Sequence, residues 1–201
     1  MTTRMVPTRR EVVDVGHICD ISCSHCYHRF EHDKSFRTKE AILQDIATAK
    51  RNGNTYIDFT GGEPTLHPDI VEIVEFVSSL ELKCCIITNG LQAEADVIPT
   101  LINHVDDWLI SAHGNEADHN KIVGFDCARV QQETFINLLE KHKRTYRVNC
   151  CILSHNQFNL VEFAEWAATK EGLRIVNFIN FNPHGVWNNH PEARAQMCDM
   201  D

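Results

Sequence analysis

The chain lacks a long hydrophobic run and an excess of positive charge. Arg4, Arg9 and Arg10 interrupt the first ten residues, and no later apolar stretch approaches the ~18 residues that a membrane-spanning helix needs. The 19 lysines and arginines are outnumbered by 28 aspartates and glutamates, and the two signs are interspersed. Nucleic acid is therefore a poor default partner, because no basic stripe is present to neutralise phosphates. We expect a cytoplasmic protein without membrane contact.

Internal repeats, low-complexity tracts and linkers are also missing, and 201 residues with 43% apolar content suit one globular domain. Short apolar runs alternate with helical patterns, which is typical of strand-helix units and a parallel sheet. Several runs are too continuously apolar for a sheet with one wet face. The six expected strands are Glu11–Val15, Thr55–Thr60, Lys83–Thr88, Asp107–Ala112, Tyr146–Ser154 and Arg174–Phe181.

The segments between these strands predict helices that cover the outside of the sheet. The clearest is Thr38–Asn52, which places Ile42, Ile46 and Ala49 on one stripe and ends before Gly53. The order predicts an α/β fold, a partial (βα)6 barrel of the TIM type with parallel strands. Residues 187–201 are too short and polar for another full unit, so we expect a chain truncated at its C-terminus. Further helices are expected after Pro68, over Ala93–Asn103 with an interruption at Pro99, over Ala128–His142, and after a capping box formed by Asn159 and Glu162.

Nine cysteines in irregular spacing argue against a disulfide framework and for metal binding. Only Cys19, Cys23 and Cys26 have ligand spacing, in a loop directly after the first strand. A 4Fe-4S cluster usually takes four cysteine thiolates, so three leave one iron free for another ligand. Such an iron can chelate the amino and carboxylate groups of S-adenosylmethionine (SAM), so that an electron from the cluster breaks a carbon-sulfur bond.

Polar and glycine-rich segments follow the next three strands. The second strand runs into Gly61-Gly62-Glu63-Pro64, the third ends in Thr88-Asn89-Gly90, and the fourth ends at Ser111. Glycines let the backbone approach a ligand closely, and a carboxylate can receive an ammonium group. All three segments lie at the C-terminal ends of predicted strands, where barrel enzymes place their active sites.

The CxxxCxxC spacing, together with these strand ends, resembles the radical SAM superfamily. The Thr88-Asn89-Gly90 turn is similar to that of the molybdopterin-precursor cyclase and peptide-modifying branches. The resemblance implies one radical SAM core domain over residues 1–201, with a 4Fe-4S cluster on Cys19, Cys23 and Cys26. It also implies the SAM contacts His25, Gly61, Gly62, Glu63, Thr88, Asn89, Ser111, Asn156 and Asn182.

By the same resemblance, the cluster cleaves SAM reductively to a 5'-deoxyadenosyl radical that abstracts hydrogen from an unidentified substrate. A reduced flavodoxin or ferredoxin supplies the electron. His25 stands where the family usually has an aromatic residue near the adenine, and a planar imidazole can also stack.

Two other classes of protein are compatible with the cysteine loop. A non-catalytic iron-sulfur electron carrier or redox sensor would use the cluster without the nucleotide. A zinc-stabilised barrel would take its fourth ligand from His17, His25 or His28. Neither alternative accounts for the Gly61-Gly62-Glu63-Pro64 segment.

The remaining cysteines and the segment after the fourth strand have simpler interpretations. Cys84-Cys85 and Cys150-Cys151 lie within predicted strands, and we expect them to be small buried hydrophobes. His113, Glu116, Asp118 and His119 have side chains that suit substrate ligands or proton carriers at the mouth of the barrel, but a solvated loop is the expected interpretation.

Overall fold

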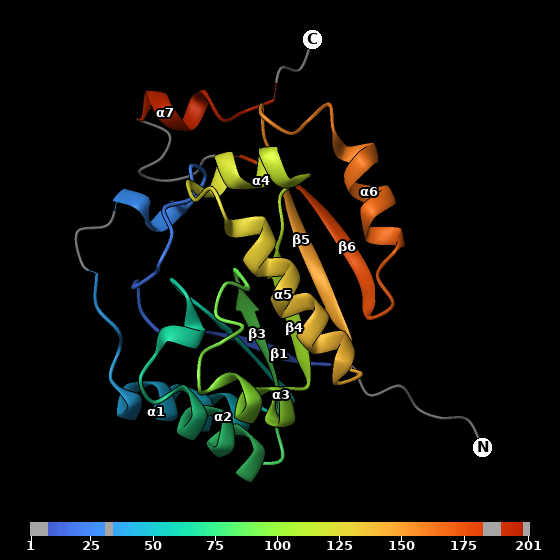
Figure 1. Cartoon of the computed structure of the whole chain (residues 1–201). Helices are drawn as coiled ribbons and strands as arrows, with labels where there is room; N and C mark the ends of the chain where they lie inside the picture. The colour runs from blue at the N-terminus through green and yellow to red at the C-terminus, as the bar shows by residue number, and fades with distance from the viewer. Residues whose placement is uncertain (1–7, 31–33, 183–189, 199–201) are drawn as a thin grey trace.

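The computed structural model describes residues 8–30, 34–182 and 190–198 (Figure 1). Six strands form one parallel sheet whose spatial order follows the chain from the first strand to the last. The predicted parallel α/β fold is confirmed, with strand limits displaced by no more than two residues. The strands are β1 (Arg10–Asp14), β2 (Tyr56–Thr60), β3 (Lys83–Thr88), β4 (Asp107–Ser111), β5 (Tyr146–Ile152) and β6 (Leu173–Asn180).

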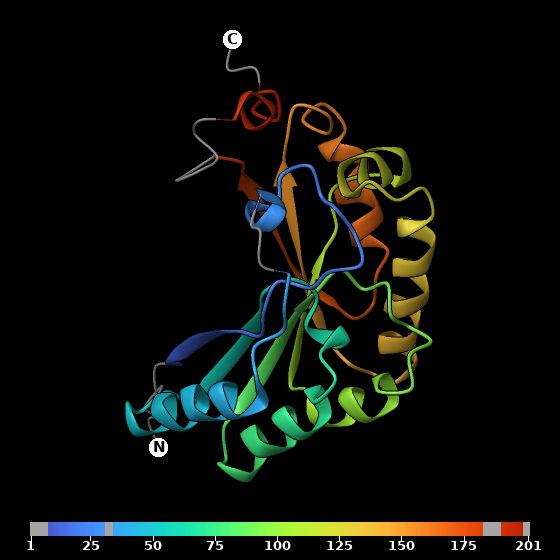
Figure 2. The same ribbon diagram turned by 90° about the vertical axis from the view of Figure 1, so that its left-hand side faces the viewer.

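The sheet is curved and open, because β1 and β6 are its two edges and do not pair with each other. Figure 2 shows the longer helices on the outer, convex side of the curve, as the apolar strands require. No helix in the described part of the chain is long and apolar enough to cross a membrane. The helices are α1 (Lys39–Arg51), α2 (Ile70–Ser79), α3 (Ile98–His104), α4 (Glu116–Val123), α5 (Ala128–Lys141), α6 (Leu160–Ala168) and α7 (Pro191–Arg194), with 3-10 turns η1 (Tyr27–Phe30) and η2 (Pro64–Leu66).

The main core lies between the sheet and these helices. Its largest fully buried side chains include Trp108, Tyr146 and Phe135. Burial of such apolar area, at about 25 cal/mol per Å², is the principal force that holds helices on a sheet. Helix α1 shows how the sequence sets the arrangement: its predicted stripe is fully buried, and Thr38 Oγ1 accepts a hydrogen bond from the Ala41 amide as N-cap.

Helix α3 differs from the sequence prediction. The helix begins at Ile98 instead of Ala93, so Pro99 lies in its first turn and does not interrupt it. The missing N–H of a proline costs nothing there, because the first amides of a helix have no partner within the helix. The predicted interruption at Pro99 was therefore wrong.

The segment expected as a solvated loop after β4 contains helix α4, so that prediction was wrong. Asn115 Oδ1 caps the helix by accepting from the Asp118 amide, and Gly124 ends it in the left-handed region at φ 74°. His119 is buried on its inner face, together with Ile122 and Val123. With only eight residues, the helix is too short for a hydrophobic period to show in the sequence.

The capping box predicted at α6 is also wrong. Asn159 precedes the helix but makes no side-chain cap; its Nδ2 donates to Asp118 Oδ2 at 2.8 Å. Glu162 accepts from Asn115 Nδ2 at 2.9 Å. Both side chains therefore fix α6 to the start of α4, a tertiary use that local spacing does not reveal.

The strand cysteines confirm the packing prediction in three of four cases. Cys84, Cys85 and Cys150 are buried and Cys151 is half-buried, all as free thiols. Burial raises the pKa of the Cys150 thiol to about 12. We expected residues 187–201 to be too short for a further strand-helix unit. Part of this segment lies outside the described residues, and its described part contains the four-residue helix α7.

Candidate functional site

The cysteine loop runs from the end of β1 to η1 and lies against the segment that follows β2. The Gly62 amide donates to the Gly16 carbonyl at 2.7 Å, and the Glu63 amide donates to the Ile18 carbonyl at 2.8 Å. A Cβ atom on Gly62 would lie 2.1 Å from the Ile18 carbonyl oxygen. Glycine at position 62 is therefore required by this close approach of two backbone segments.

Helix α4 holds the other side of the cysteine loop. The Ser24 amide donates to the Ile122 carbonyl at 2.8 Å. Ile21 and Cys23 pack against a small core that includes Ile122 and Val123. Helix α4, which the sequence analysis did not predict, thus supports the cysteine loop.

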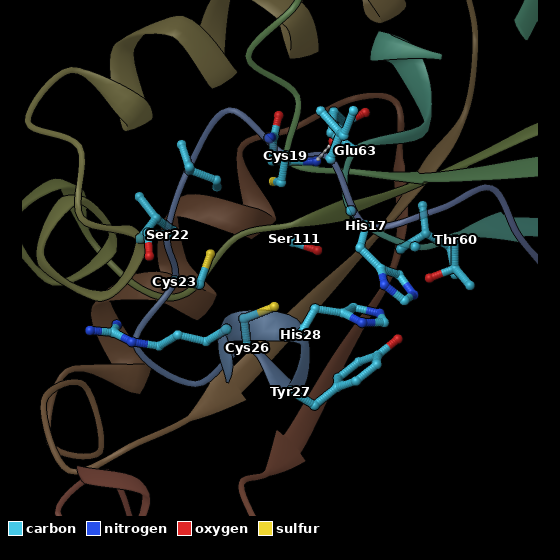
Figure 3. Close-up of a pocket in the computed structure, with 18 of the residues that line it drawn as sticks. His17, Cys19, Ser22, Cys23, Cys26, Tyr27, His28, Thr60, Glu63 and Ser111 are labelled. Atoms are coloured by element: carbon cyan, nitrogen blue, oxygen red, sulfur yellow. Dashed lines mark hydrogen bonds between the residues drawn. The ribbon is translucent and has the colours of Figure 1, made fainter. Parts of the chain in front are cut away.

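One cavity of about 710 Å³ lies at the C-terminal ends of the strands, a volume ordinary for a small-molecule or cofactor site. Figure 3 shows Cys19, Cys23, Cys26 and Ser111 arranged around it. Ten of the twelve predicted site residues line the cavity, namely Cys19, Cys23, His25, Cys26, Gly61, Gly62, Glu63, Thr88, Asn89 and Ser111.

The three cysteines suit a metal cluster in both number and environment. All three are free thiols on one short loop and line the same cavity. Burial raises the pKa of the Cys23 thiol well above its ordinary value, and the neighbouring Cys26 and Cys19 raise it further. Three thiolates in this setting need positive charge beside them, which iron in a cluster provides.

Glu63 is a buried acid with an internal set of partners. Its Oε1 accepts from the Thr65 amide at 3.1 Å, from Thr65 Oγ1 at 2.6 Å and from Thr88 Oγ1 at 2.9 Å, while Oε2 accepts from the Asn89 amide at 2.8 Å. Burial raises the pKa of the Glu63 carboxyl, and the Thr65, Asn89 and Thr88 hydrogen bonds oppose that rise. The carboxyl group therefore joins the end of β2 to the end of β3.

The end of β3 is also joined to the cysteine loop and to β4. Asn89 Nδ2 donates to Asp20 Oδ1 at 2.7 Å, which fixes the loop between Cys19 and Cys23. Gln132 of α5 is fully buried, and its Nε2 donates to the carbonyls of Asn89 at 2.7 Å and Ser111 at 2.9 Å. Sequence reasoning missed Gln132, although a polar residue among the apolar positions of α5 was a visible signal.

Three histidines form one group of rings, and two of them, His25 and His113, line the cavity. His25 and His113 meet edge to face with ring centroids 4.6 Å apart, and His119 Nδ1 accepts from the His113 amide at 3.2 Å. Burial lowers the pKa of His25 to about 4 and that of His119 to about 3, and it lowers the pKa of His113 as well. All three rings are therefore neutral at physiological pH.

Two predicted contacts lie elsewhere in the structure. Asn156 is fully buried beneath the end of β5, where its Nδ2 donates to the carbonyls of His113 and Cys151 and its Oδ1 accepts from the Leu153 amide. Asn182 is exposed after β6. Neither side chain lines the cavity.

Comparison with protein families agrees with the cluster and cofactor site that the geometry indicates. Residues 13–168 match the model of the radical SAM superfamily. The chain belongs to the radical SAM superfamily. Membership of this family implies a 4Fe-4S cluster and SAM as cofactors. The residues present fit both groups, because three thiols and a glycine-rich strand end line one cavity.

Curated radical SAM relatives are named for reactions on nucleotides. A probable GTP 3',8-cyclase of Saccharolobus islandicus is 25% identical over 177 residues, which are 87% of this chain and 57% of the relative. An S-adenosylmethionine-dependent nucleotide dehydratase of Flammeovirga pacifica is 30% identical over 112 residues, covering 53% of this chain and 39% of the relative. The chain thus spans little more than half the length of the cyclase and about two fifths of the length of the dehydratase.

Solved radical SAM structures show the same fold. Streptococcus suis SuiB bound to S-adenosylmethionine has a TM-score of 0.77 at 16% identity, with 89% of this chain and 42% of SuiB covered. The protein anSMEcpe with bound AdoMet and a peptide has a TM-score of 0.72 at 18% identity, with 90% of this chain and 55% of the other covered. The partial TIM-type barrel is therefore that of the family.

Proposed function

We propose that the protein is a radical SAM enzyme with its cluster on Cys19, Cys23 and Cys26. The convergence of these thiols with Gly61–Glu63 and Ser111 on one cavity is the observation that supports the proposal most directly. When bound, the cluster supplies the electron that cleaves SAM to methionine and a 5'-deoxyadenosyl radical, which takes hydrogen from a substrate. The chain itself binds, orients and shields these groups.

The proposed cofactor contacts divide into direct and supporting residues. Gly61 and Gly62 give the methionine end of SAM close access to backbone, while Ser111 and His25 face its nucleoside. The Thr88 side chain donates a hydrogen bond to Glu63 and the Asn89 side chain donates one to Asp20, so both hold the end of β3 at the cavity wall. We assign no cofactor contact to Asn156 or Asn182.

A nucleotide or another phosphate-bearing molecule is the substrate class that we propose. The curated relatives are named for nucleotides, and the basic side chains of Arg29 and Lys34 line the cavity. A reduced flavodoxin or ferredoxin is the proposed electron donor. Nucleoside triphosphates should raise 5'-deoxyadenosine formation above its unstimulated rate, and precursor peptides should not.

The test of the proposed activity uses anaerobically reconstituted protein. We expect about four irons and four sulfides per chain, and slow formation of 5'-deoxyadenosine from SAM after reduction by dithionite. Cys23→Ala should lose both iron and product. Cys127→Ala is the matched control, since this cysteine is exposed at the start of α5 and does not line the cavity. A fully loaded protein that cleaves no SAM would favour the electron-carrier alternative.

A further inference from the structure

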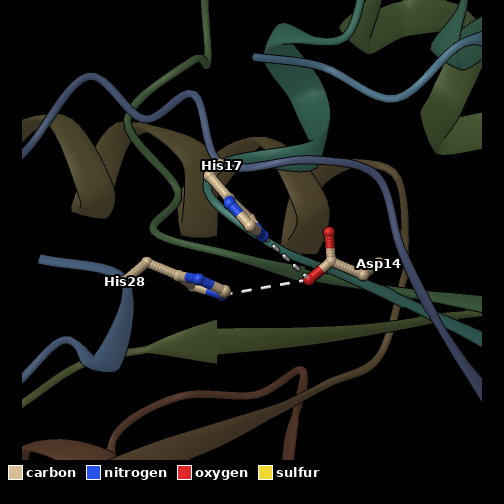
Figure 4. A group of neighbouring side chains, drawn as sticks. All are labelled: Asp14, His17 and His28. Atoms are coloured by element: carbon tan, nitrogen blue, oxygen red, sulfur yellow. Dashed lines mark ion pairs between the residues drawn. The ribbon is translucent and has the colours of Figure 1, made fainter. Parts of the chain in front are cut away.

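Three side chains that can ligate a metal, Asp14, His17 and His28, lie close together at the two ends of the cysteine loop (Figure 4). Asp14, His17 and His28 place one ligand atom each within 4.8 Å of the others. His17 Nε2 is 3.8 Å and His28 Nε2 is 3.9 Å from Asp14 Oδ2, and the two imidazole centroids are 4.3 Å apart.

These separations suit ligands that share one ion better than groups that bond directly. A nitrogen and an oxygen 3.8 Å apart are beyond hydrogen-bond length. Two ligand atoms that each lie about 2.1 Å from a tetrahedral ion are about 3.4 Å apart, so small side-chain rotations would bring the three atoms into range.

The surroundings orient the carboxylate toward the two imidazoles. Asp14 Oδ1 accepts from the Gly16 amide at 2.7 Å, while Oδ2 faces His17 and His28. Such hydrogen bonds to the second oxygen of a ligand fix its direction. The nearby Arg37 donates to the Asp14 backbone carbonyl at 2.8 Å, and its charge is balanced by Asp45 at 2.7 Å.

We propose that Asp14, His17 and His28 bind one divalent ion of the zinc class, separate from the iron-sulfur cluster. Two imidazoles and a carboxylate suit zinc and similar ions, whereas the thiolates of the loop suit iron and sulfide. Asp14 ends β1, His17 begins the cysteine loop and His28 lies in η1 directly after it. The ion therefore joins both ends of the loop to the sheet.

The position left open by three protein ligands faces the cavity. His17 and His28 both line the cavity wall, whereas Asp14 is not among its lining residues. A zinc ion with three protein ligands keeps its fourth position for water or for a ligand from solution.

The test adds zinc chloride to anaerobic, cluster-loaded protein and measures bound zinc, iron and sulfide after gel filtration. Wild-type protein should retain one zinc per chain with its iron content unchanged. Asp14→Asn and His17→Gln should weaken zinc binding by more than about 100-fold, because even substitutions behind a ligand cost 10- to 100-fold. His104→Gln, at an exposed histidine of α3, should bind zinc like the wild type.

Zinc that enters only at the expense of iron would overturn the proposal, and so would equal zinc uptake by Asp14→Asn and wild type. Asp14→Asn keeps an oxygen for the Gly16 amide, so the turn should remain folded; its circular dichroism and cluster absorbance check this. X-ray absorption at the zinc edge of the wild-type protein gives a result without any variant. Nitrogen and oxygen scatterers are expected, and sulfur scatterers would refute the site.

Discussion

The Glu63 side chain makes its hydrogen bonds through one buried carboxylate. Four donors from Thr65, Thr88 and Asn89 surround it, so it is not a solvated turn residue. Direct contact with the ammonium group of SAM stays a prediction. Its internal partners show that it also controls where the ends of β2 and β3 stand.

Replacing Glu63 by glutamine should separate charge from shape. The amide would present an N–H to the Asn89 amide, so one hydrogen bond is lost and the others become weaker. We expect SAM affinity to fall about five- to 150-fold, which corresponds to about 1 to 3 kcal/mol, with iron content unchanged. Calorimetric titration of SAM measures the affinity. Glu165→Gln on exposed α6 is the control, and equal affinity in all three proteins would contradict a role for the Glu63 charge.

His113 and His119 should make stability depend on pH. Their folded-state pKa values lie below the ordinary 6.5, His119 at about 3, mainly because both rings are buried. Between about pH 6.5 and about pH 3 the unfolded chain binds protons that the folded chain does not, so the free energy of unfolding falls as pH is lowered. His119 contributes about 1.4 kcal/mol per pH unit in this window, and His113 acts in the same direction.

Urea unfolding at about pH 7 and about pH 5 measures this effect. His119→Asn keeps an acceptor for the His113 amide but cannot titrate, so its unfolding free energy should depend less steeply on pH. The exposed His142 provides the control His142→Gln, which should keep the wild-type slope. Identical slopes in wild type and His119→Asn would show that His119 titrates normally.

At the scale of elements, helix α5 positions the cavity wall through a single side chain. Gln132 holds the carbonyls at the ends of β3 and β4. Gln132→Met should leave these buried carbonyls without that donor and lower the free energy of unfolding by about 1 to 3 kcal/mol. SAM affinity should fall with it. Gln131→Met, at the exposed neighbouring position, is the matched control. Normal SAM affinity in Gln132→Met would show that α5 only packs on the sheet.

The sequence revealed those elements whose signals are local. The apolar runs located all six strands, and Cys19–Cys26 with Gly61–Glu63 located the cavity, because ligand spacing and glycine turns depend on neighbouring residues. Helix α4 was missed because eight residues are too few to show a hydrophobic period, and the role of Gln132 was missed because its partners are distant in the chain. Ser24 bonds to Ile122, and Gln132 bonds to Asn89; only the folded sheet brings such pairs together.

For the whole molecule, the open edge of the sheet at β6 carries a group of exposed apolar side chains. No strand among the described residues pairs with the outer edge of β6, where Ile175, Phe178 and Ile179 are 50%, 44% and 45% exposed. Unpaired apolar edge strands favour association between molecules. We expect the sedimentation coefficient of the wild type to rise with concentration and that of Ile179→Lys to stay constant. Val161→Lys on exposed α6 should behave like the wild type, and a constant wild-type value would contradict the expectation.

The order of the strands has a consequence for biosynthesis. Each strand pairs with the one that immediately precedes it, so a chain leaving the ribosome can add one strand-helix unit at a time without waiting for distant partners. Among the described residues, all those that line the cavity lie at or before Val123, whereas β5 and β6 come later. The proposed cluster ligands and the proposed SAM contacts are thus translated before the last third of the chain, so the iron-sulfur assembly machinery can meet them on a nascent chain.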